Sequence, residues 1–470
     1  TIDETERGDT TNKKSTAMCA WWQSQDTSGS RLLSPVASPQ CDLPPSTDVS
    51  IAGRALLVNG DPYEVRGLAY SPLLGYEARM VAPPDIFTQR HAARWSLDLH
   101  HLAALGANTL RLYNWDPAEH EHDIAFLDAC AAVGLRVILP ISNYFLDHPD
   151  MVKRIVYRVA SHRSLLMWAV SNEAAGTTPP ASPKAREAFA KVARLTAEVR
   201  KAEKLVNTWH PISVPLTCDV EAMLELTKVG AVVDVDAFNC YWATDQTFPV
   251  DFYAQLAAAS SRPALLSEFG IDALDNIAGT VDEDVQANHL VAEWRSLVSA
   301  DGSGGATIGA VVFEWLDEPW KAVKSAELGG ACEPNRGGIR AGWGPNALPD
   351  QCANEAFFGI SELLPNGSLH LKRAYFALRR EWAGAGRECA LGPMAARDSE
   401  VSVADSVFLR YATGGLGVAS LLLVACVITA LRHFRLRPNT LHDEQRELAD
   451  QADCDTQEDD GEPELKSSRK

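Results

Sequence analysis

A short apolar stretch that ends in an amide and a carboxylate constrains this chain more than any other feature. Residues 165–170 are apolar on both faces, and they are followed by Ser171, Asn172 and Glu173. An apolar run of this length without alternation is typical of a parallel strand that is covered on both sides. In parallel α/β folds, ligands and reacting groups gather at the carboxyl ends of the strands. We therefore expect Asn172 and Glu173 to lie at a functional edge.

A second apolar stretch with the same kind of ending lies downstream. Residues 263–267 lead into Glu268, which follows Glu173 by 95 residues. A closed barrel of about 250 residues spends roughly 31 residues on each of its eight β/α units. The separation therefore corresponds to about three units. If Glu173 ends a fourth strand, Glu268 is predicted to end the seventh.

The chain between residues 65 and 315 alternates between strand-like and helix-like segments. We expect strands at 65–70, 109–113, 136–141, 165–173, 205–209 or a few residues later, 235–241, 263–270 and 308–315. Helices are expected at 90–105, 119–133, 147–160, 183–204, 220–228, 252–260, 281–299 and 371–382. Such alternation indicates a parallel sheet, and eight units in one domain favour an α/β fold of the closed (β/α)₈ type. A hairpin that turns at Asn59-Gly60 is expected to feed or cap the first strand.

Charge and motif content exclude several classes of partner. The net charge of −19 and the pI near 5.1 argue against a nucleic-acid partner. No Gly-rich phosphate loop follows the first strand, so no nucleotide cofactor is indicated. No Cys/His spacing matches a zinc site, and the 12 His residues are scattered, so we expect neither a metal nor a cofactor.

The segments outside the expected barrel domain, 51–382, differ from it in composition. Residues 1–50 are predicted to be a flexible extracellular leader that follows a removed signal or begins a fragment, and 383–411 a linker. Residues 412–431 hold no charge and are long enough to span a bilayer as a single helix. Basic residues follow at once, which predicts a type I protein of the plasma membrane or secretory pathway, with the barrel outside the cytoplasm. The acidic tail, 432–470, is predicted to be disordered in the cytoplasm, where a partner is not identified.

The ten cysteines fit an exported protein. From their positions in loops, Cys332 is expected to pair with Cys352, and Cys19 with Cys41. Cys218 and Cys240 either form a disulfide or are buried thiols.

Several of these segments resemble one group of enzymes. Residues 162–173, His-Arg-Ser-Leu-Leu-Met-Trp-Ala-Val-Ser-Asn-Glu, resemble the acid/base strand of retaining glycoside hydrolases of clan A, especially family 2. Residues 108–117 are similar to the second strand of the family 72 β-1,3-glucanosyltransferases. Residues 266–270, Leu-Ser-Glu-Phe-Gly, resemble the nucleophile strand of both families, and 312–315 with 319–321 fit the aromatic eighth strand. The resemblance covers about residues 60–382.

The resemblance implies two catalytic carboxylates. Glu268 would attack the anomeric carbon of the sugar, and Glu173 would act as the general acid and base. Asn172 would bond the 2-hydroxyl of that sugar. Tyr241 would hold Glu268 by a hydrogen bond, and Arg111 would lie beneath Glu268 and stabilise its charge.

Two aromatic residues are expected to shape the substrate site. Trp315 would form an apolar platform for the sugar ring, and Tyr113 a side wall. Trp315 as an ordinary core residue, and Arg111 as a plain ion pair at the barrel rim, are the structural alternatives.

Taken with the apolar span, the resemblance implies a membrane-anchored retaining β-glycosidase or transglycosylase that acts on extracellular or cell-wall polysaccharide. Two other functions remain open. One is a catalytically inactive barrel that binds glycans as an ectodomain. The other is a signalling protein whose acidic tail recruits cytosolic partners.

Overall fold

The computed structural model describes residues 42–71, 87, 92–115, 123–241, 250–275, 278–298, 307–319, 338–340, 352–364 and 367–382. The predicted linker, span and tail, 383–470, lie outside these residues, as do Cys19, Cys41 and Cys332 and most of the predicted leader. Among the described residues, no helix has both the length and the apolar character needed to cross a membrane.

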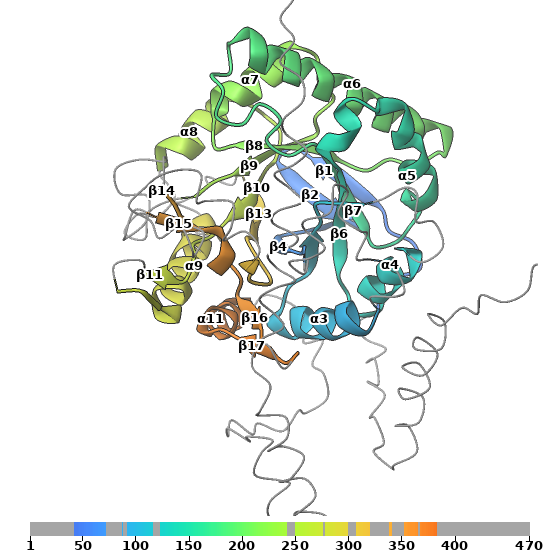
Figure 1. Ribbon diagram of the computed structural model, residues 1–470. Coiled ribbons are helices and arrows are strands. Elements are labelled where there is room, and N and C mark those ends of the chain that lie inside the picture. The colour runs from blue at the N-terminus through green and yellow to red at the C-terminus, as the bar shows by residue number, and fades with distance from the viewer. Residues whose placement is uncertain are drawn as a thin grey trace, which may run out of the picture. The chain divides into compact units, whose positions relative to one another are not determined.

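Eight parallel strands close into a barrel (Figure 1). In chain order they are β4 (Val65–Ala69), β5 (Thr109–Arg111), β6 (Arg136–Ile141), β7 (Leu165–Val170), β8 (Ile212–Thr217), β9 (Val235–Asn239), β10 (Ala264–Phe269) and β13 (Thr307–Val312). β13 pairs back onto β4 and completes the ring. The predicted α/β barrel is therefore confirmed, with β7 as its fourth strand and β10 as its seventh. The fifth strand is β8, the later of the two positions allowed, because α6 (Pro183–Leu205) ends at the start of the earlier one and a turn at Val206 and Asn207 follows.

Helices surround the strands (Figure 1). Besides α6 they are α3 (Ala92–Leu105), α4 (Asp123–Ala132), α5 (Val152–Val159), α7 (Val220–Lys228), α8 (Val250–Ala259), α9 (Glu283–Val298) and α11 (Arg373–Trp382). Local signals fix several helix ends. Ser182 and Asp219 cap α6 and α7 by accepting backbone N–H groups, and Gly106 follows α3 with a positive φ of 93°, a conformation that favours glycine.

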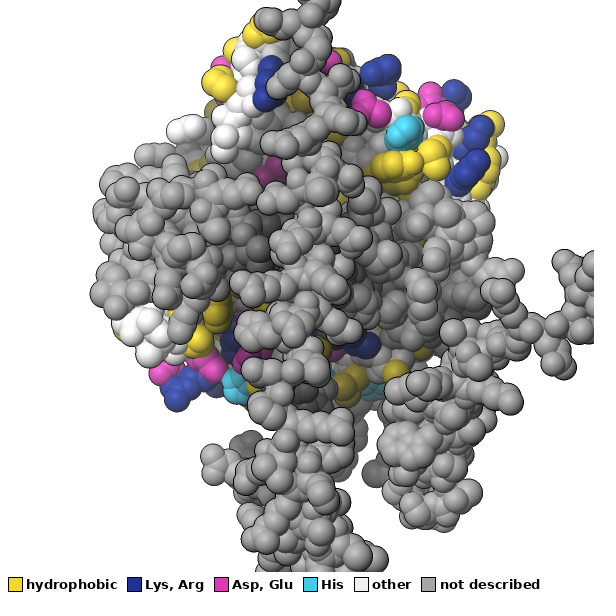
Figure 2. Space-filling model, viewed as in Figure 1, with side chains coloured by type: hydrophobic (Ala, Val, Ile, Leu, Met, Phe, Trp, Pro, Cys, Tyr) yellow, Lys and Arg dark blue, Asp and Glu magenta, His cyan; other side chains and the backbone are white. Residues whose placement is uncertain are grey.

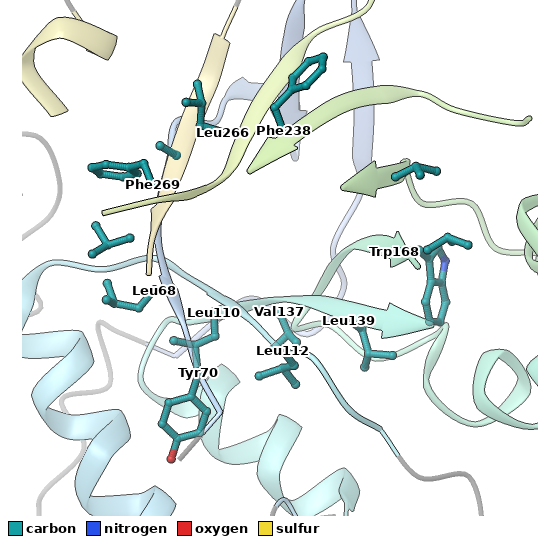
Figure 3. Close-up of a cluster of buried hydrophobic side chains, with 14 of the residues drawn as sticks. Leu68, Tyr70, Leu110, Leu112, Val137, Leu139, Trp168, Phe238, Leu266 and Phe269 are labelled. Carbon is teal, nitrogen blue, oxygen red and sulfur yellow. The ribbon is translucent and has the colours of Figure 1, made fainter. Parts of the chain in front are cut away.

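The larger part of the core lies between the barrel wall and these helices. Trp95, Leu99, Leu102 and Leu105 lie on the buried side of α3, which matches the helical spacing seen in the sequence. Figure 3 shows buried side chains that come from several barrel strands and belong to this layer, Trp168 among them. Because the strands are covered on this outer face and packed on their inner one, they are apolar on both.

A small antiparallel sheet closes one end of the barrel. It consists of β1 (Val49–Ala52), β2 (Ala55–Val58) and β3 (Asp61–Pro62), and the chain turns at Asn59-Gly60 as expected. Val49, Leu56 and Val58 belong to the same buried cluster as inward-facing barrel residues such as Leu265. The predicted hairpin thus caps the interior of the barrel.

Part of the predicted leader contacts the barrel domain. The Leu43 N–H donates to the carbonyl oxygen of Ala131 at 2.9 Å, and Asp42 forms an ion pair with Arg163 at 2.8 Å. β1 begins at Val49, before the expected domain start at residue 51. These contacts connect residues 42–50 with the barrel.

Short elements complete the described chain. They are the strand pairs β11–β12 (Leu274–Asp275, Thr280–Val281), β14–β15 (Gly338–Arg340, Cys352–Asn354) and β16–β17 (Ser361–Leu363, Leu369–Leu371), and the 3₁₀ turns η2 (Asn143–Leu146), η3 (Pro149–Met151) and η6 (Glu355–Phe357). Figure 2 shows that the described side chains on the visible face carry charges of both signs. An ion pair of 3.0 Å joins Arg186 of α6 to Glu225 of α7.

Candidate active site

Glu268 lies at the carboxyl end of β10, where three side-chain donors meet its carboxylate. Arg111 Nη1 and Tyr113 Oη each donate to Oε1 at 2.8 Å, and Tyr241 Oη donates to Oε2 at 2.5 Å. The donors come from the ends of β5 and β9, which bring residues far apart in sequence to one point. Three donors on one carboxylate fix its orientation and stabilise its negative charge.

Both phenols are suited to donate to Glu268. Burial, together with the nearby charge of Glu268, raises the pKa of Tyr241 well above 10. Burial likewise raises the pKa of Tyr113 well above 10, although the charge of Arg111 opposes this shift. Each phenol therefore keeps its proton at physiological pH and presents it to the carboxylate. Tyr113 was expected as a side wall, and the structure adds this direct contact with Glu268.

The segment after β7 is held in an unusual backbone conformation. Ser171 and Glu173 have positive φ angles of 67° and 48°, which few residues other than glycine adopt. The Asn143 side chain supports this turn: its Oδ1 accepts from Ser171 Oγ and from the Asn172 N–H, and its Nδ2 donates to the Asn172 carbonyl oxygen. The Glu173 N–H donates to the Pro215 carbonyl oxygen at 3.0 Å. These contacts fix where the Glu173 side chain starts.

The environment of Glu173 differs from that of Glu268. Burial first, and then the negative charge of Glu268, raise the pKa of Glu173 above its ordinary value. Its Oε1 accepts one hydrogen bond at 2.8 Å, from Asn239 Nδ2. No guanidinium donates to Glu173 among the described residues. Glu268 thus has an arginine partner, whereas the environment of Glu173 favours its protonated form.

Asn172 joins the two halves of the site. Its Oδ1 accepts from Arg111 Nη2 at 2.7 Å and from Asn239 Nδ2 at 3.1 Å. Its Nδ2 makes no hydrogen bond to any residue that the structure describes. That nitrogen is therefore the group of Asn172 that can donate to a bound molecule.

The expectation for Trp315 is wrong. Its side chain is only 1% exposed, and its ring lies against those of His101 in α3 and Tyr375 in α11. Trp315 therefore packs in the layer between the barrel and the helices and offers no open platform. The aromatic residue on the site side is Phe313, whose half-buried ring lies 6.2 Å from that of Tyr113 and 6.3 Å from that of Tyr241, both edge to face.

Sequence reasoning missed Asn239, Asn143 and Phe313. Strand alternation offered a signal for Asn239, because it lies two residues before Tyr241 and so on the same face of the strand. For Phe313 this signal is weaker, because the residue follows the last residue of β13, Val312. Asn143 gave no such signal, because it lies in the turn η2 rather than in a strand.

A cavity of about 240 Å³ opens beside these groups. Its lining includes Arg111, Tyr113, Asn114, Tyr144 and Asn172, from the ends of β5, β6 and β7 and the turns that follow them. A smaller cavity of about 60 Å³ is lined by Glu173, Thr217 and Asp219 among others. No group of three or more potential metal-ligating His, Cys, Asp or Glu side chains occurs among the described residues.

Cys218 and Cys240 form a disulfide, which decides between the two alternatives left open. It connects the segment after β8 with the segment after β9. Cys240 lies between Asn239 and Tyr241, so the bond anchors the strand end that contacts both Glu173 and Glu268.

Comparison with known proteins agrees with this architecture. No family model matches the sequence. The chain is 24% identical to the β-glucuronidase of Canis lupus familiaris over 243 residues, and 22% identical to that of Rattus norvegicus over 246. These matches cover 48% and 49% of this chain but only 34% of each relative, so the chain matches about a third of their length.

Among solved structures, Saccharomyces cerevisiae Gas2p in complex with laminaripentaose superimposes with a TM-score of 0.52 at 18% identity, over 73% of this chain and 70% of that one. Gas2p in complex with laminaritriose and laminaritetraose gives a TM-score of 0.51 at 17% identity, over 73% and 69%. The chain shares the closed (β/α)₈ barrel fold with these structures. In this barrel, Glu173 and Glu268 lie at the carboxyl ends of the fourth and seventh strands, as the sequence spacing predicted.

Proposed function

We propose that this chain is a retaining β-glycosidase or transglycosylase that works by double displacement. The observation that carries the proposal is the unequal pair of carboxylates. Glu268 receives Arg111 and two phenols, whereas burial and the charge of Glu268 favour the protonated form of Glu173. A retaining enzyme needs this combination of one ionised nucleophile and one protonated acid.

The first chemical step forms an ester between enzyme and sugar. A carboxylate oxygen of Glu268 attacks the anomeric carbon while Glu173 gives its proton to the departing glycosidic oxygen. In the second step Glu173, now ionised, removes a proton from water or from a sugar hydroxyl. That oxygen attacks the anomeric carbon, and Glu268 leaves as a carboxylate.

The proposed substrate is a β-linked oligo- or polysaccharide of the β-glucan type. Two observations support it: the cavity beside Arg111 and Asn172, and the fold shared with Gas2p, which was solved with laminari-oligosaccharides. Asn172 Nδ2 is positioned to donate to a substrate hydroxyl, and Phe313 to contact the apolar face of a sugar ring. A water acceptor gives hydrolysis and a sugar acceptor gives transglycosylation.

We further propose that residues 412–431 anchor the enzyme in the plasma membrane or a secretory-pathway membrane, with the barrel outside the cytoplasm. The support is the uncharged segment and the basic residues that follow it. Protease added to intact cells should remove the barrel and spare a tagged tail. A barrel that resists protease in intact cells but not in permeabilised ones would rule out this orientation at the cell surface.

Covalent labelling tests the nucleophile. A panel of 2-deoxy-2-fluoro β-glycosyl fluorides, including glucosyl and glucuronyl forms, should trap the glycosyl-enzyme. The 2-fluorine slows both chemical steps, but the good fluoride leaving group lets the first step outrun the second. Mass spectrometry of the digested protein should place the sugar on Glu268, and Glu268→Ala should abolish labelling. A label on Glu314, the nearest rival at the end of β13, would refute the assignment.

Azide rescue tests the acid/base. Glu173→Ala should lose most activity on substrates with poor leaving groups and much less on activated aryl β-glycosides, which leave without a proton. Added azide should restore turnover of the activated substrates and yield a β-glycosyl azide. Equal losses on both substrates without rescue would exclude this role, and no turnover of any glycoside by the native chain would favour the glycan-binding ectodomain.

A further inference from the structure

Asn239, at the end of β9, uses its whole side-chain amide within the site. Nδ2 donates to Glu173 Oε1 at 2.8 Å and to Asn172 Oδ1 at 3.1 Å. Oδ1 accepts from Ser267 Oγ at 2.8 Å and from Arg111 Nη1 at 3.1 Å. A carboxamide has two N–H donors and two acceptor lone pairs, so all four positions are filled.

This network permits only one orientation of the amide. If nitrogen and oxygen exchanged places, the oxygen would face the oxygen atoms of Glu173 and Asn172. The NH₂ group would then face Arg111, which can only donate. Asn239 is also 4% exposed, so water cannot readily replace a lost partner. The groups around Asn239 therefore fix the orientation in which its Nδ2 donates to Glu173.

We propose that Asn239 is a positioning residue that selects which oxygen of Glu173 carries the catalytic proton. The inference rests on the proposed function. Because Oε1 accepts the N–H of Asn239, it is held as the unprotonated oxygen of the carboxylic acid. Oε2 then carries the proton that is given to the leaving oxygen. Oε2 receives no hydrogen bond from any described residue, so it remains able to meet a substrate.

The same amide connects the two catalytic carboxylates. Arg111 Nη1 donates to both Asn239 and Glu268, so a chain of three hydrogen bonds runs from Glu173 to Glu268. Strand alternation places Asn239 and Tyr241 on the barrel interior, and Cys240 between them faces outward to Cys218. The end of β9 therefore orients the acid through Asn239 and the nucleophile through Tyr241.

Asn239 could instead have a purely structural role, in which it satisfies buried polar groups without affecting the chemistry of Glu173. Titration of Glu173 separates this role from the proposed positioning role. An N–H donated to a carboxylate stabilises its ionised form, so this contact lowers the pKa of Glu173 against the upward effects of burial and Glu268. Removing the donor should raise that pKa. A residue with a purely structural role would leave it unchanged.

The test titrates Glu173 directly in the full chain. The protein is labelled with ¹³C at glutamate side-chain carboxyls, and the Glu173 signal is assigned by its absence in Glu173→Gln. We expect its apparent pKa to rise in Asn239→Ala and to rise further in Asn239→Asp, which places a second carboxylate beside Glu173. The nearly isosteric Asp variant carries the test if the Ala variant fails to fold. An unchanged pKa in a folded variant would overturn the proposal.

Ser213→Ala is the matched control. Ser213 is a buried polar residue on the neighbouring strand β8, and its hydroxyl donates to the Trp168 carbonyl oxygen without touching either carboxylate. This variant should leave the titration of Glu173 where it is in the native chain. If Ser213→Ala shifts the pKa of Glu173 as much as Asn239→Ala does, the loss of any buried polar group disturbs Glu173. That result would also overturn the proposal.

Kinetics provide the second measurement. On substrates with poor leaving groups, Asn239→Ala should lower kcat/KM at least about tenfold, which is part of the roughly 10²–10⁴-fold that general acid catalysis typically contributes. On activated aryl β-glycosides the loss should be several-fold smaller, and the alkaline limb of the pH profile should move to higher pH. Equal losses of kcat/KM on both kinds of substrate in Asn239→Ala would contradict only the role proposed for Asn239. Loss of azide rescue in Glu173→Ala would instead count against the proposed function.

Discussion

Arg111 Nη1 lies 2.8 Å from Glu268 Oε1, and the two side chains are only 2% and 8% exposed. The guanidinium also donates to the Ser267 carbonyl oxygen and to Asn172. A buried ion pair of this kind is costly to break from one side, because the remaining charge loses its partner while it stays desolvated. Stability and catalysis are therefore linked at this pair.

We expect Arg111→Met to lower the free energy of unfolding by roughly 3–5 kcal/mol, the usual cost of leaving a buried charge uncompensated. The double variant Arg111→Met/Glu268→Gln should recover most of that stability and remain inactive. Urea unfolding of the native chain, of the single variants Arg111→Met and Glu268→Gln, and of the double variant measures the coupling. If the double variant is as unstable as Arg111→Met, the ion pair is not the source of the loss.

The charge of Glu268 should be visible in the titration of Glu173. Burial is the largest cause of the raised pKa of Glu173, and repulsion from Glu268 is the second. In Glu268→Gln the repulsion is gone while the burial remains. We therefore expect the pKa of Glu173 to fall towards, but not reach, the ordinary value for glutamate.

The sign of the resulting pH dependence follows from the role of Glu173 as an acid. Its protonated form persists to higher pH than that of an ordinary glutamate, so the native enzyme should lose activity only as pH rises through the raised pKa. The alkaline limb of kcat/KM and the ¹³C titration of Glu173 should agree. An alkaline limb that lies at the ordinary glutamate pKa would contradict this reading.

Removal of the Cys218–Cys240 disulfide should reduce both stability and activity. The bond closes a loop with a sequence separation of 22, for which loop-closure entropy predicts roughly 3 kcal/mol of stabilisation. Cys218→Ser/Cys240→Ser should lose about that much in urea unfolding. Activity should fall as well, because Cys240 anchors Asn239 and Tyr241. A stable double variant with native kcat/KM would show that the strand end is held by other contacts.

Phe313 and Trp315 should respond oppositely to truncation. Trp315→Ala should destabilise the fold by about 3–5 kcal/mol, because it removes a fully buried aromatic side chain. Phe313→Ala should cost less stability but raise KM or lower kcat, because its half-buried ring packs on both tyrosines that hold Glu268. Urea unfolding and steady-state kinetics of both variants measure these effects. A large kinetic effect in Trp315→Ala but not in Phe313→Ala would mean that Trp315 is the platform for the sugar ring after all.

The sequence by itself determined the barrel and the positions of its two carboxylates. Strand and helix periods are local properties, and consecutive strands of a parallel barrel are neighbours in space. Counting units was therefore enough to place Glu173 at the end of β7 and Glu268 at the end of β10. The contacts of Arg111 and Tyr241 with Glu268 also agree with the positions that the family resemblance gave them.

Only the tertiary structure decided which groups complete the site. Period-two alternation predicts which face a side chain lies on only while a strand continues, and β13 ends at Val312. The direction of the Trp315 side chain therefore depended on how the segment after β13 packs against α3 and α11. The network of Asn239 depends on four partners from the ends of three other strands, β5, β7 and β10, which no local pattern connects. Likewise, the register of β8 against β9 places Thr217 opposite Asn239, and this brings the next residues, Cys218 and Cys240, within bonding distance. The spacing of the two cysteines along the chain does not encode that register.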